Sequence, residues 1–377
     1  MGTCKFCGKA EREISEILQV CRNCILEGDW DEVKPHILNI HKQVRQLVDL
    51  PEKPPKAERP NIKLKCNLCI NECSLSNNDI SYCGLRNTQA RSSGNLPYPS
   101  KSKGYIHGYI DPNPTNCCNS WFCPAGTSSG YPDYSNYKGP EFGTYSYAAF
   151  LYGCTFDCLF CQNASHKLFS KKYLFDVETL ANQIVKNTKI TCLCYFGGTP
   201  EAQLPFSINL ADKILEKCNN RVMRICWECN GSGNKDWIEN CMKIAVKTGG
   251  NIKFDLKTFN EKLNIALCGI SNKRTLDNFK FLAENYFGSR GPEMPEISAC
   301  TLMVPGYTTH EEVKLIAEFV GSINPEIPFS LLIFHGAYQM RDLGITPRRQ
   351  VEHCLKVAKK YLENVNLGNK FLLGFNT

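Results

Sequence analysis

After about residue 145, hydrophobic and polar residues follow two different patterns along the chain. Short apolar runs bounded by turn residues predict strands, and longer segments with apolar residues three and four positions apart predict helices. We predict strands at residues 146–153, 190–197, 222–229, 251–256, 297–304 and 329–334. We predict helices at residues 176–188, 206–218, 235–248, 260–287, 309–321 and 347–363.

Strands that alternate with helices are typical of a parallel α/β fold, because each parallel connection needs a crossover long enough to hold a helix. Six strand–helix units predict a partial (β/α)6, TIM-like barrel, with a doubly wound open sheet as the alternative. Asp176 is placed to cap the first helix, and the last helix is expected to have Thr346 as its cap and Pro347 as its first residue. The apolar stretch 371–375 offers a further strand that would close the sheet.

The residues before 146 lack this alternation. Apolar residues at helical spacing predict a helix over 30–50, which Pro51 ends. Residues 51–60 contain four prolines and five charges, which predicts a linker or a surface strap. Residues 101–145 are rich in glycine, proline and tyrosine and predict a long irregular segment, a kind that is usually functional or an insert in a compact protein.

The bulk composition indicates an ordinary globular chain with one unusual residue type. Of 377 residues, 42% are hydrophobic, which allows a real core. No run of about 18 apolar residues is present and the N-terminus lacks the apolar centre of a signal peptide, so we expect a cytoplasmic protein without membrane spans. The net charge of +7 permits an acidic protein or a nucleic-acid partner but does not require one.

Cysteine is the unusual residue, with 23 in the chain. Most stand in C-x2-C and C-x3-C clusters, which in a long chain without an export signal favours metal ligation in a reducing cytosol over disulfides. Cysteines outside these clusters are expected to be small buried hydrophobic residues: Cys218, Cys241, Cys268, Cys300 and Cys354. Cys226 and Cys229 are not expected to share a metal, because residues three apart on a strand point to opposite faces.

The first cluster predicts a small ribbon held by a metal. Two C-x2-C pairs, separated by 13 residues, supply four thiolates: Cys4, Cys7, Cys21 and Cys24. This set suits tetrahedral zinc, with a rubredoxin-like iron, an iron–sulfur cluster or no metal as alternatives. So small a ribbon buries little core, so metal binding has to supply its folding energy.

Two further cysteine groups precede the predicted barrel. One is a C-x2-C-x3-C-x9-C module that predicts a second metal site, either zinc or iron–sulfur: Cys66, Cys69, Cys73 and Cys83. The other is Cys117, Cys118 and Cys123, which either complete a site with that module, ligate a further cluster, or pack as apolar groups beside Trp121 and Phe122. We therefore divide the chain into a ribbon with a helix at 1–50, a linker at 51–60, a cysteine-rich module at 61–145, the barrel at 146–365 and a tail at 366–377.

The sequence LYGCTFDCLFCQN at 151–163 contains the most informative cluster, Cys154, Cys158 and Cys161, in the spacing C-x3-C-x2-C. Three thiolates can bind three irons of a [4Fe–4S] cluster and leave the fourth iron open to an outside ligand. A zinc knuckle or three unrelated thiols are the alternatives.

This spacing, with Phe160 before the last cysteine, resembles the signature of the radical S-adenosylmethionine (radical SAM) enzymes. The resemblance implies that the open iron binds SAM and that an electron from a flavodoxin- or ferredoxin-type donor cleaves it to a 5′-deoxyadenosyl radical. It also implies that Phe160, Gln162 and Asn163 line the adenine side. The module at 66–84 with its C-G-L-R end resembles that of relatives of the pyruvate formate-lyase activating enzyme, which favours a second iron–sulfur cluster there.

Motifs at the predicted strand ends resemble those of the activating enzymes, in the same order. Residues 197–201, GGTPE, resemble the G-G-E-P motif, so Gly197, Gly198 and Thr199 are expected near the SAM amino group, although Thr199 replaces the usual glutamate. Further expected site residues are Glu228 and Asn230 in W-E-C-N-G, Asp255 and Lys257 in D-L-K, the V-P-G turn at 304–306, and His335 after the sixth strand. The resemblance implies that Lys257 contacts SAM or substrate and that Glu228 and Asp255 help to hold a monovalent cation; a structural ion pair is the alternative.

The resemblance predicts a radical SAM enzyme of the activating-enzyme-like branch, whose target the sequence leaves open. Hydrogen abstraction from a glycine of a partner protein is one hypothesis. Modification of a peptide, another protein residue, RNA or a small molecule is the alternative, and a non-enzymatic electron carrier or scaffold is a third. The exposed iron predicts sensitivity to oxygen and an anoxic cytoplasm.

Overall fold

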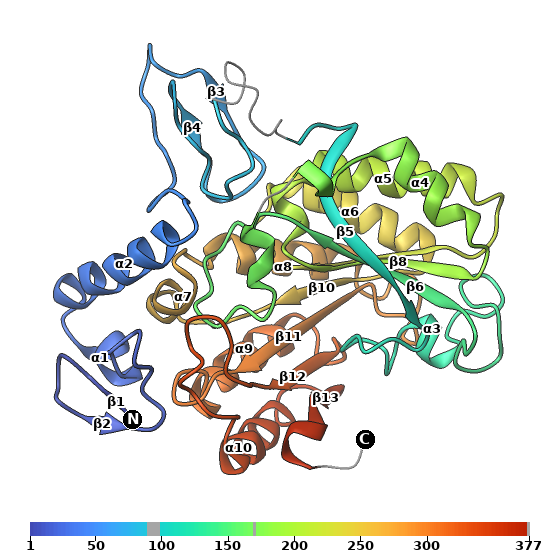
Figure 1. Ribbon diagram of the computed structural model, residues 1–377. Coiled ribbons are helices and arrows are strands. Elements are labelled where there is room, and N and C mark those ends of the chain that lie inside the picture. Colours follow the sequence, from blue (N-terminus) through green and yellow to red (C-terminus); the bar gives the residue numbers. More distant parts are fainter. Residues whose placement is uncertain (89–98, 169–170, 375–377) are drawn as a thin grey trace.

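A computed structural model describes residues 1–88, 99–168 and 171–374 (Figure 1). Within these ranges the main sheet has nine strands in the order β13-β12-β11-β10-β9-β8-β6-β5-β7. The strands are β5 (Lys103–Pro112), β6 (Tyr145–Leu151), β7 (Leu174–Asp176), β8 (Ile190–Gly197), β9 (Arg224–Cys229), β10 (Ile252–Asp255), β11 (Ile297–Met303), β12 (Phe329–Ile333) and β13 (Val365–Gly368).

The pairing of these strands confirms a partial parallel barrel. In the order β6-β8-β9-β10-β11-β12-β13, each strand pairs in parallel with the next. Strand β5 runs antiparallel to both β6 and β7. The helices of the barrel are α4 (Val177–Lys186), α5 (Leu204–Lys217), α6 (Lys235–Thr248), α7 (Glu261–Cys268), α8 (Lys273–Tyr286), α9 (His310–Ile323) and α10 (Arg348–Ala358). Figure 1 shows the sheet curving without closing. Because these strands are parallel, their carboxyl ends lie on one side of the sheet.

Successive side chains of each strand point alternately to the apolar core under the helices and to the barrel interior. On β9, Ile225 and Trp227 belong to the large apolar cluster under the helices, whereas Cys226 and Glu228 line interior cavities. This arrangement follows from the two-residue period of a strand, which sends neighbouring side chains to opposite faces. Asp176 caps α4 as predicted, because its carboxylate accepts hydrogen bonds from the backbone of Glu178 and Thr179.

The helical stretches predicted over residues 260–287 are two helices, α7 and α8, because Gly269 adopts a left-handed conformation after α7. Three other sequence-based expectations about elements are wrong. Residues 103–112 form the long strand β5 rather than part of an irregular segment. Thr346 does not cap α10: its hydroxyl joins two strand ends by accepting from the Phe334 amide and donating to the Met303 carbonyl, each at 2.8 Å.

The third error concerns the last strand. The residues 370–373 form a short 3-10 helix rather than a closing strand, and residues 375–377 lie outside the described ranges. The seventh parallel strand is instead β13, which pairs with β12. Asn369 ends β13 because it adopts a left-handed conformation that turns the chain away from the sheet.

The N-terminal residues pack against the barrel beside α7 (Figure 1). They comprise the hairpin of β1 (Gly2–Thr3) and β2 (Ala10–Glu11), then α1 (Arg22–Glu27) and α2 (Trp30–Gln46). Tyr307, which follows the predicted V-P-G turn, fixes this contact: its hydroxyl donates to the Val20 carbonyl at 2.9 Å and accepts from the Ser15 amide at 3.1 Å.

The residues 51–88 form a strap and a small module beside the sheet. The strap is tied down by the Ala57 amide, which donates to the Ser74 carbonyl at 2.9 Å. The module contains the hairpin of β3 (Leu64–Lys65) and β4 (Ser74–Leu75). Within the described ranges, no helix combines the length and apolar character that crossing a bilayer requires.

Candidate functional site

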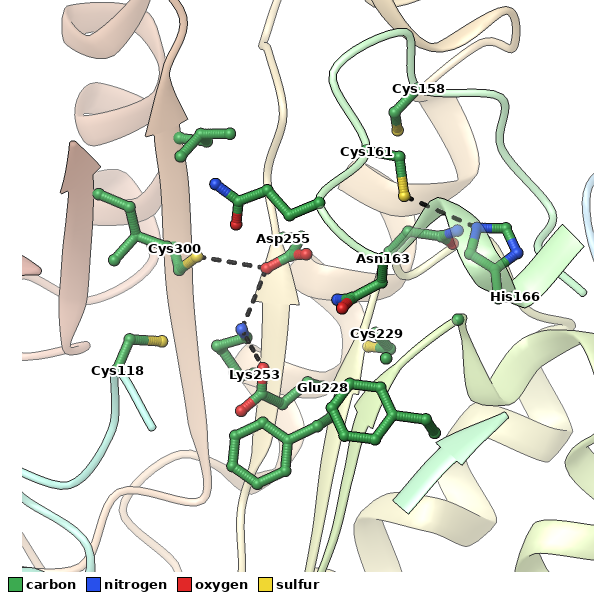
Figure 2. A pocket seen from close by; sticks show the side chains of 18 of the residues that line it. Cys118, Cys158, Cys161, Asn163, His166, Glu228, Cys229, Lys253, Asp255 and Cys300 are labelled. Atoms are coloured by element: carbon green, nitrogen blue, oxygen red, sulfur yellow. Dashed lines mark hydrogen bonds and ion pairs between the residues drawn. The ribbon is translucent and has the colours of Figure 1, made fainter. Parts of the chain in front are cut away.

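A cavity of about 360 Å³ opens at the carboxyl ends of the parallel strands. Most of the predicted site residues line it: Cys154, Cys158, Phe160, Cys161, Gln162, Asn163, Gly197, Gly198, Glu228, Asn230, Asp255 and Lys257. Figure 2 shows Cys158 and Cys161 on one side of this cavity and Cys118 and Cys300 on the other, with Asp255 and Lys253 between them. The strand ends therefore bring together residues that are more than 100 positions apart in the sequence.

The three-cysteine loop, residues 154–161, is anchored by a buried aspartate. Asp157 is fully buried and accepts from Lys167 Nζ at 2.5 Å and His41 Nδ1 at 3.0 Å, with Arg45 Nη1 at 3.5 Å. Burial alone would raise the pKa of Asp157, but the His41 hydrogen bond and the Lys167 charge hold it well below its usual range. Helix α2, which supplies His41 and Arg45, is thus part of the support of this loop.

The three thiols of this loop fit a cluster better than a single ion. Within the described residues, the only group of three or more potential ligands whose atoms all lie within 4.8 Å of one another is at the N-terminus, so these three sulfurs are spaced more widely. Burial raises the pKa of Cys154 and of Cys161, to about 11 for Cys161, and the contact with Cys268, together with burial, raises that of Cys158. A bound cationic cluster would offset this cost and hold them as thiolates.

Other polar groups near these thiols lie behind the loop or at its edge. Cys268 Sγ lies 3.4 Å from Cys158 Sγ, but Cys268 belongs to the buried core of α7 and does not line the cavity. His166 Nε2 lies 3.7 Å from Cys161 Sγ, and burial lowers the pKa of His166 to about 3, so its ring is neutral. Of these two groups, only His166 lines the cavity.

The paired glycines permit a close backbone approach after β8. A Cβ atom on Gly198 would lie 1.8 Å from the Leu151 carbonyl oxygen, and its φ of +64° suits glycine. A Cβ on Gly197 would lie 2.3 Å from the Phe150 ring. Thr199 lies outside the cavity lining: its hydroxyl bonds the Glu201 carboxylate, which also accepts from the Gly231 amide at 2.6 Å. Thr199 therefore helps to link the ends of β8 and β9.

The loop, the end of β9 and the cysteine-rich module meet at one point. Asn230 Nδ2 donates to Thr155 Oγ1 at 2.7 Å, and the Thr155 and Ser232 hydroxyls lie 2.8 Å apart. The module joins them through Asn71 Nδ2, which donates to the Thr155 carbonyl at 2.8 Å, and through the Ile70 amide, which donates to the Ser232 carbonyl at 2.8 Å. The module containing Cys66–Cys83 thus holds the three-cysteine loop in place.

A row of charges crosses the floor of the cavity. Lys253 Nζ lies 2.5 Å from Glu228 Oε2 and 3.2 Å from Asp255 Oδ1, and Lys257 Nζ lies 2.7 Å from Asp255 Oδ2. Burial would raise the pKa of Asp255, but the two lysines hold it well below its usual range. The Lys253 ammonium thus stands between the two carboxylates for which the resemblance implied a monovalent cation.

Besides Thr199, two predicted site residues, His335 and Cys123, lie outside the lining of the main cavity. His335 is exposed, does not line the cavity, and has its Nδ1 3.4 Å from the Gly336 carbonyl oxygen. Cys117 and Cys118 line the main cavity, whereas Cys123 lines a separate, smaller one. Neither cavity is lined by the cysteines of the 66–83 module.

The sequence analysis missed several residues of this site. Lys253 is two positions before Asp255, so strand alternation could have placed it on the same inward face. Asn369 lines the cavity from the turn after β13, and Asp157 supports the loop from behind. No local pattern marks Asp157, because its partners come from α2 and from Lys167.

The four N-terminal thiols form a second, closed site. The sulfurs of Cys4, Cys7, Cys21 and Cys24 lie within 4.8 Å of one another, and those of Cys7 and Cys21 are 3.8 Å apart. A tetrahedral zinc ion with Zn–S bonds of about 2.3 Å places its sulfurs about 3.8 Å apart. The predicted four-cysteine metal site is therefore present, and its geometry suits a single ion.

Residues 149–320, which contain the three-cysteine loop and the strands β8 to β11 of the partial barrel, match the model of the radical SAM superfamily. Within that superfamily the chain resembles the branch of the glycyl-radical activating enzymes. The family implies a [4Fe–4S] cluster and SAM as its cofactors.

The relatives are distant. A protein of Methanocaldococcus jannaschii, MJ1632, which is named as a candidate glycyl-radical enzyme activating enzyme, is 25% identical over 224 residues, covering 58% of this chain and 79% of that protein. The isethionate sulfite-lyase activating enzyme of Desulfovibrio desulfuricans is 29% identical over 151 residues, covering 39% of this chain and 44% of the enzyme. A solved domain of a pyruvate-formate lyase-activating enzyme from Bacteroides vulgatus aligns with a TM-score of 0.37 at 20% identity, covering 47% of this chain and 98% of that domain.

Proposed function

We propose that this enzyme cleaves SAM reductively and uses the resulting radical to abstract a hydrogen atom from a glycine of a partner protein. The observation that carries the first part is the convergence of Cys154, Cys158 and Cys161 on one cavity with the paired glycines and the D-L-K lysine. When bound at the three thiols, the cluster supplies the electron that splits SAM into methionine and a 5′-deoxyadenosyl radical.

The residues around the loop would bind and orient the sulfonium ligand. The Gly197–Gly198 turn offers backbone groups without side chains, which suits contact with the amino group of SAM. Lys257 carries a positive charge beside the thiols; although burial lowers its pKa, Asp255 and Cys158 raise it above its usual range. That charge suits the SAM carboxylate, while Asp255 keeps the lysine in position.

Glycine as the target is supported by the distant activating-enzyme relatives. A flavodoxin or ferredoxin would be the electron donor. The module at Cys66–Cys83, which is hydrogen-bonded to the three-cysteine loop, would hold an iron–sulfur cluster that passes electrons to the site. An iron content of only about four per chain would contradict this relay.

The first test is SAM cleavage by the Cys158→Ala variant, reconstituted with iron and sulfide without oxygen. We expect no 5′-deoxyadenosine above background, because one iron of the cluster loses its thiolate. Cys218→Ala, which removes a buried thiol outside all clusters, should retain the activity. Undiminished 5′-deoxyadenosine from Cys158→Ala would refute the assignment.

The second test addresses the target. The loaded enzyme, SAM and a reductant would be mixed with glycyl-radical enzymes from the source organism and examined by electron paramagnetic resonance. A glycyl signal that depends on SAM supports activation. Normal SAM cleavage with no protein radical in any of these partners would reject glycine as the target while leaving the cleavage assignment intact.

A further inference from the structure

Four thiols from three segments converge on the smaller cavity, which has a volume of about 30 Å³ and lies inside the barrel. They are Cys192 and Cys194 on β8, Cys226 on β9, and Cys123 at the start of α3 (Pro124–Thr127). Cys192 and Cys194 share a face of their strand, and Cys194 is directly opposite Cys226 in the parallel register. The convergence is therefore built into the sheet.

The sulfurs are neighbours in space. Cys192 and Cys194 belong to one small buried cluster, and Cys123 and Cys226 pack against it. The four sulfurs are nevertheless more widely spread than those of the N-terminal site, since they do not all lie within 4.8 Å of one another. A centre with more than one metal ion, or one ion that draws them inward, suits this spread.

These thiols have charged and polar neighbours as well as the apolar side chains of Ala125 and Phe196. Arg224 Nε donates to Cys192 Sγ at 3.1 Å, a contact that favours the thiolate. Asn113 and Ser146 also line the cavity and are at least 97% buried, and the Asn113 Oδ1 and Ser146 Oγ atoms have no hydrogen-bond partner. Buried polar atoms without a partner are rare, so they indicate that a polar species occupies the space.

Other buried thiols of the chain show the contrast. Cys241 and Cys354 lie in the large apolar cluster and line neither of these two cavities. They are small hydrophobic residues, as the sequence predicts. Cys229, three positions after Cys226, belongs to the same apolar cluster and lines only the main cavity of the two.

We propose that Cys123, Cys192, Cys194 and Cys226 bind a further metal centre inside the barrel, made of the thiophilic metals iron or zinc. Thiolate sets of this kind select these metals over magnesium or calcium. Because Cys117 lines both cavities, the centre would lie next to the floor of the main site. Zinc would make it a structural brace between β8, β9 and the segment before α3; iron would make it redox-active.

The test is a count of iron, zinc and acid-labile sulfide per chain in the full-length protein purified without oxygen. We expect Cys194→Ser to contain at least one equivalent of iron or zinc less than the wild type, whereas Cys241→Ser contains the wild-type amount. A loss of zinc identifies a zinc site, and a loss of iron with sulfide identifies a cluster. The low-temperature resonance of the reduced three-cysteine-loop cluster, with its change on SAM addition, should persist in both variants.

Equal metal contents in wild type, Cys194→Ser and Cys241→Ser would overturn the proposal, whatever the result of the SAM cleavage tests. If Cys194→Ser does not fold, the rate at which Cys226 of the wild type is alkylated tests the proposal instead. Cys226 is partly exposed, so metal should protect it. We expect Cys226 to react at least tenfold faster after chelation; an unchanged rate would contradict the metal centre.

Discussion

The N-terminal ribbon, residues 2–24, and the three-cysteine loop, residues 154–161, both present thiols from short turns, yet only the ribbon draws all of its sulfurs together. Its four thiols lie within 4.8 Å of one another, and the separation of Cys7 and Cys21 matches the edge of a zinc tetrahedron. The three thiols of the loop are more widely spaced and face a cavity.

The ribbon and the loop show how a closed and an open metal site are built. The ribbon completes its ligand set from its own sequence, so little room remains for an outside ligand. The loop provides three ligands and depends on other elements for its shape: α2 and Lys167 hold Asp157, and the 66–83 module holds Thr155. An open site of this kind has to be kept in shape by protein that is not part of it.

The largest effect should come from breaking the closed site. Cys7→Ser should release the ribbon's metal and unfold residues before about 24, because metal binding supplies about 10 kcal/mol or more to small cysteine sites. Zinc analysis and limited proteolysis would measure this, and the iron of the three-cysteine loop should remain. A stably folded ribbon without metal would contradict the closed-site interpretation.

The open site should be most sensitive to the residue behind it. Asp157→Asn leaves Lys167 and Arg45 buried without a countercharge, which should lower the free energy of unfolding by about 3–5 kcal/mol. Glu178→Gln, which alters an exposed ion pair with Lys217, should change it by less than about 1 kcal/mol. Urea unfolding measures the free energy of unfolding of both variants. Equal losses in Asp157→Asn and Glu178→Gln would show that the Asp157 network does not support the loop.

A pH-dependent effect should come from Glu201, under the glycine turn. Burial raises the pKa of Glu201 to about 7, from 4.5 in the unfolded chain. The folded state therefore binds the extra proton, so this contribution to stability is complete below pH 4.5 and is lost as the pH rises through 7. The difference corresponds to about 3 kcal/mol.

Glu201→Gln tests this assignment, because the glutamine amide is neutral and its oxygen can still accept from the Gly231 amide. Melting temperatures between pH 5 and 8 should fall more steeply with pH in the wild type than in the variant. Parallel curves would mean that Glu201 does not titrate in this range.

The smallest effect should come from the contact between the ribbon and the barrel. Tyr307→Phe removes the hydroxyl that bonds Ser15 and Val20, which should cost about 1–2 kcal/mol of stability and loosen the ribbon. Hydrogen exchange at the Ser15 amide should become faster, whereas Tyr137→Phe, at an exposed position, should leave it unchanged. Unaltered exchange in Tyr307→Phe would show that the ribbon is held by its apolar contacts alone.

Much of the barrel could be predicted from the sequence because its signals are local. Short apolar runs bounded by turn residues identified all six predicted strands, and the D-L-K and W-E-C-N segments fell at strand ends that face the cavity. The closing strand was misplaced because β13, with the sequence Val-Asn-Leu-Gly, has weak strand propensity and owes its conformation to pairing with β12.

By itself, the sequence determined the parallel α/β fold, the four-cysteine ribbon and the three-cysteine loop, because periodicity and ligand spacing are properties of neighbouring residues. Only the tertiary structure decided that α2 supports the loop, that Lys253 stands between Glu228 and Asp255, and that Cys123 faces Cys192, Cys194 and Cys226. The contact of Lys253 with Glu228 spans 25 positions, and that of His41 with Asp157 spans 116. Such separations are set by how the strands pair and how the helices pack, which no local pattern records.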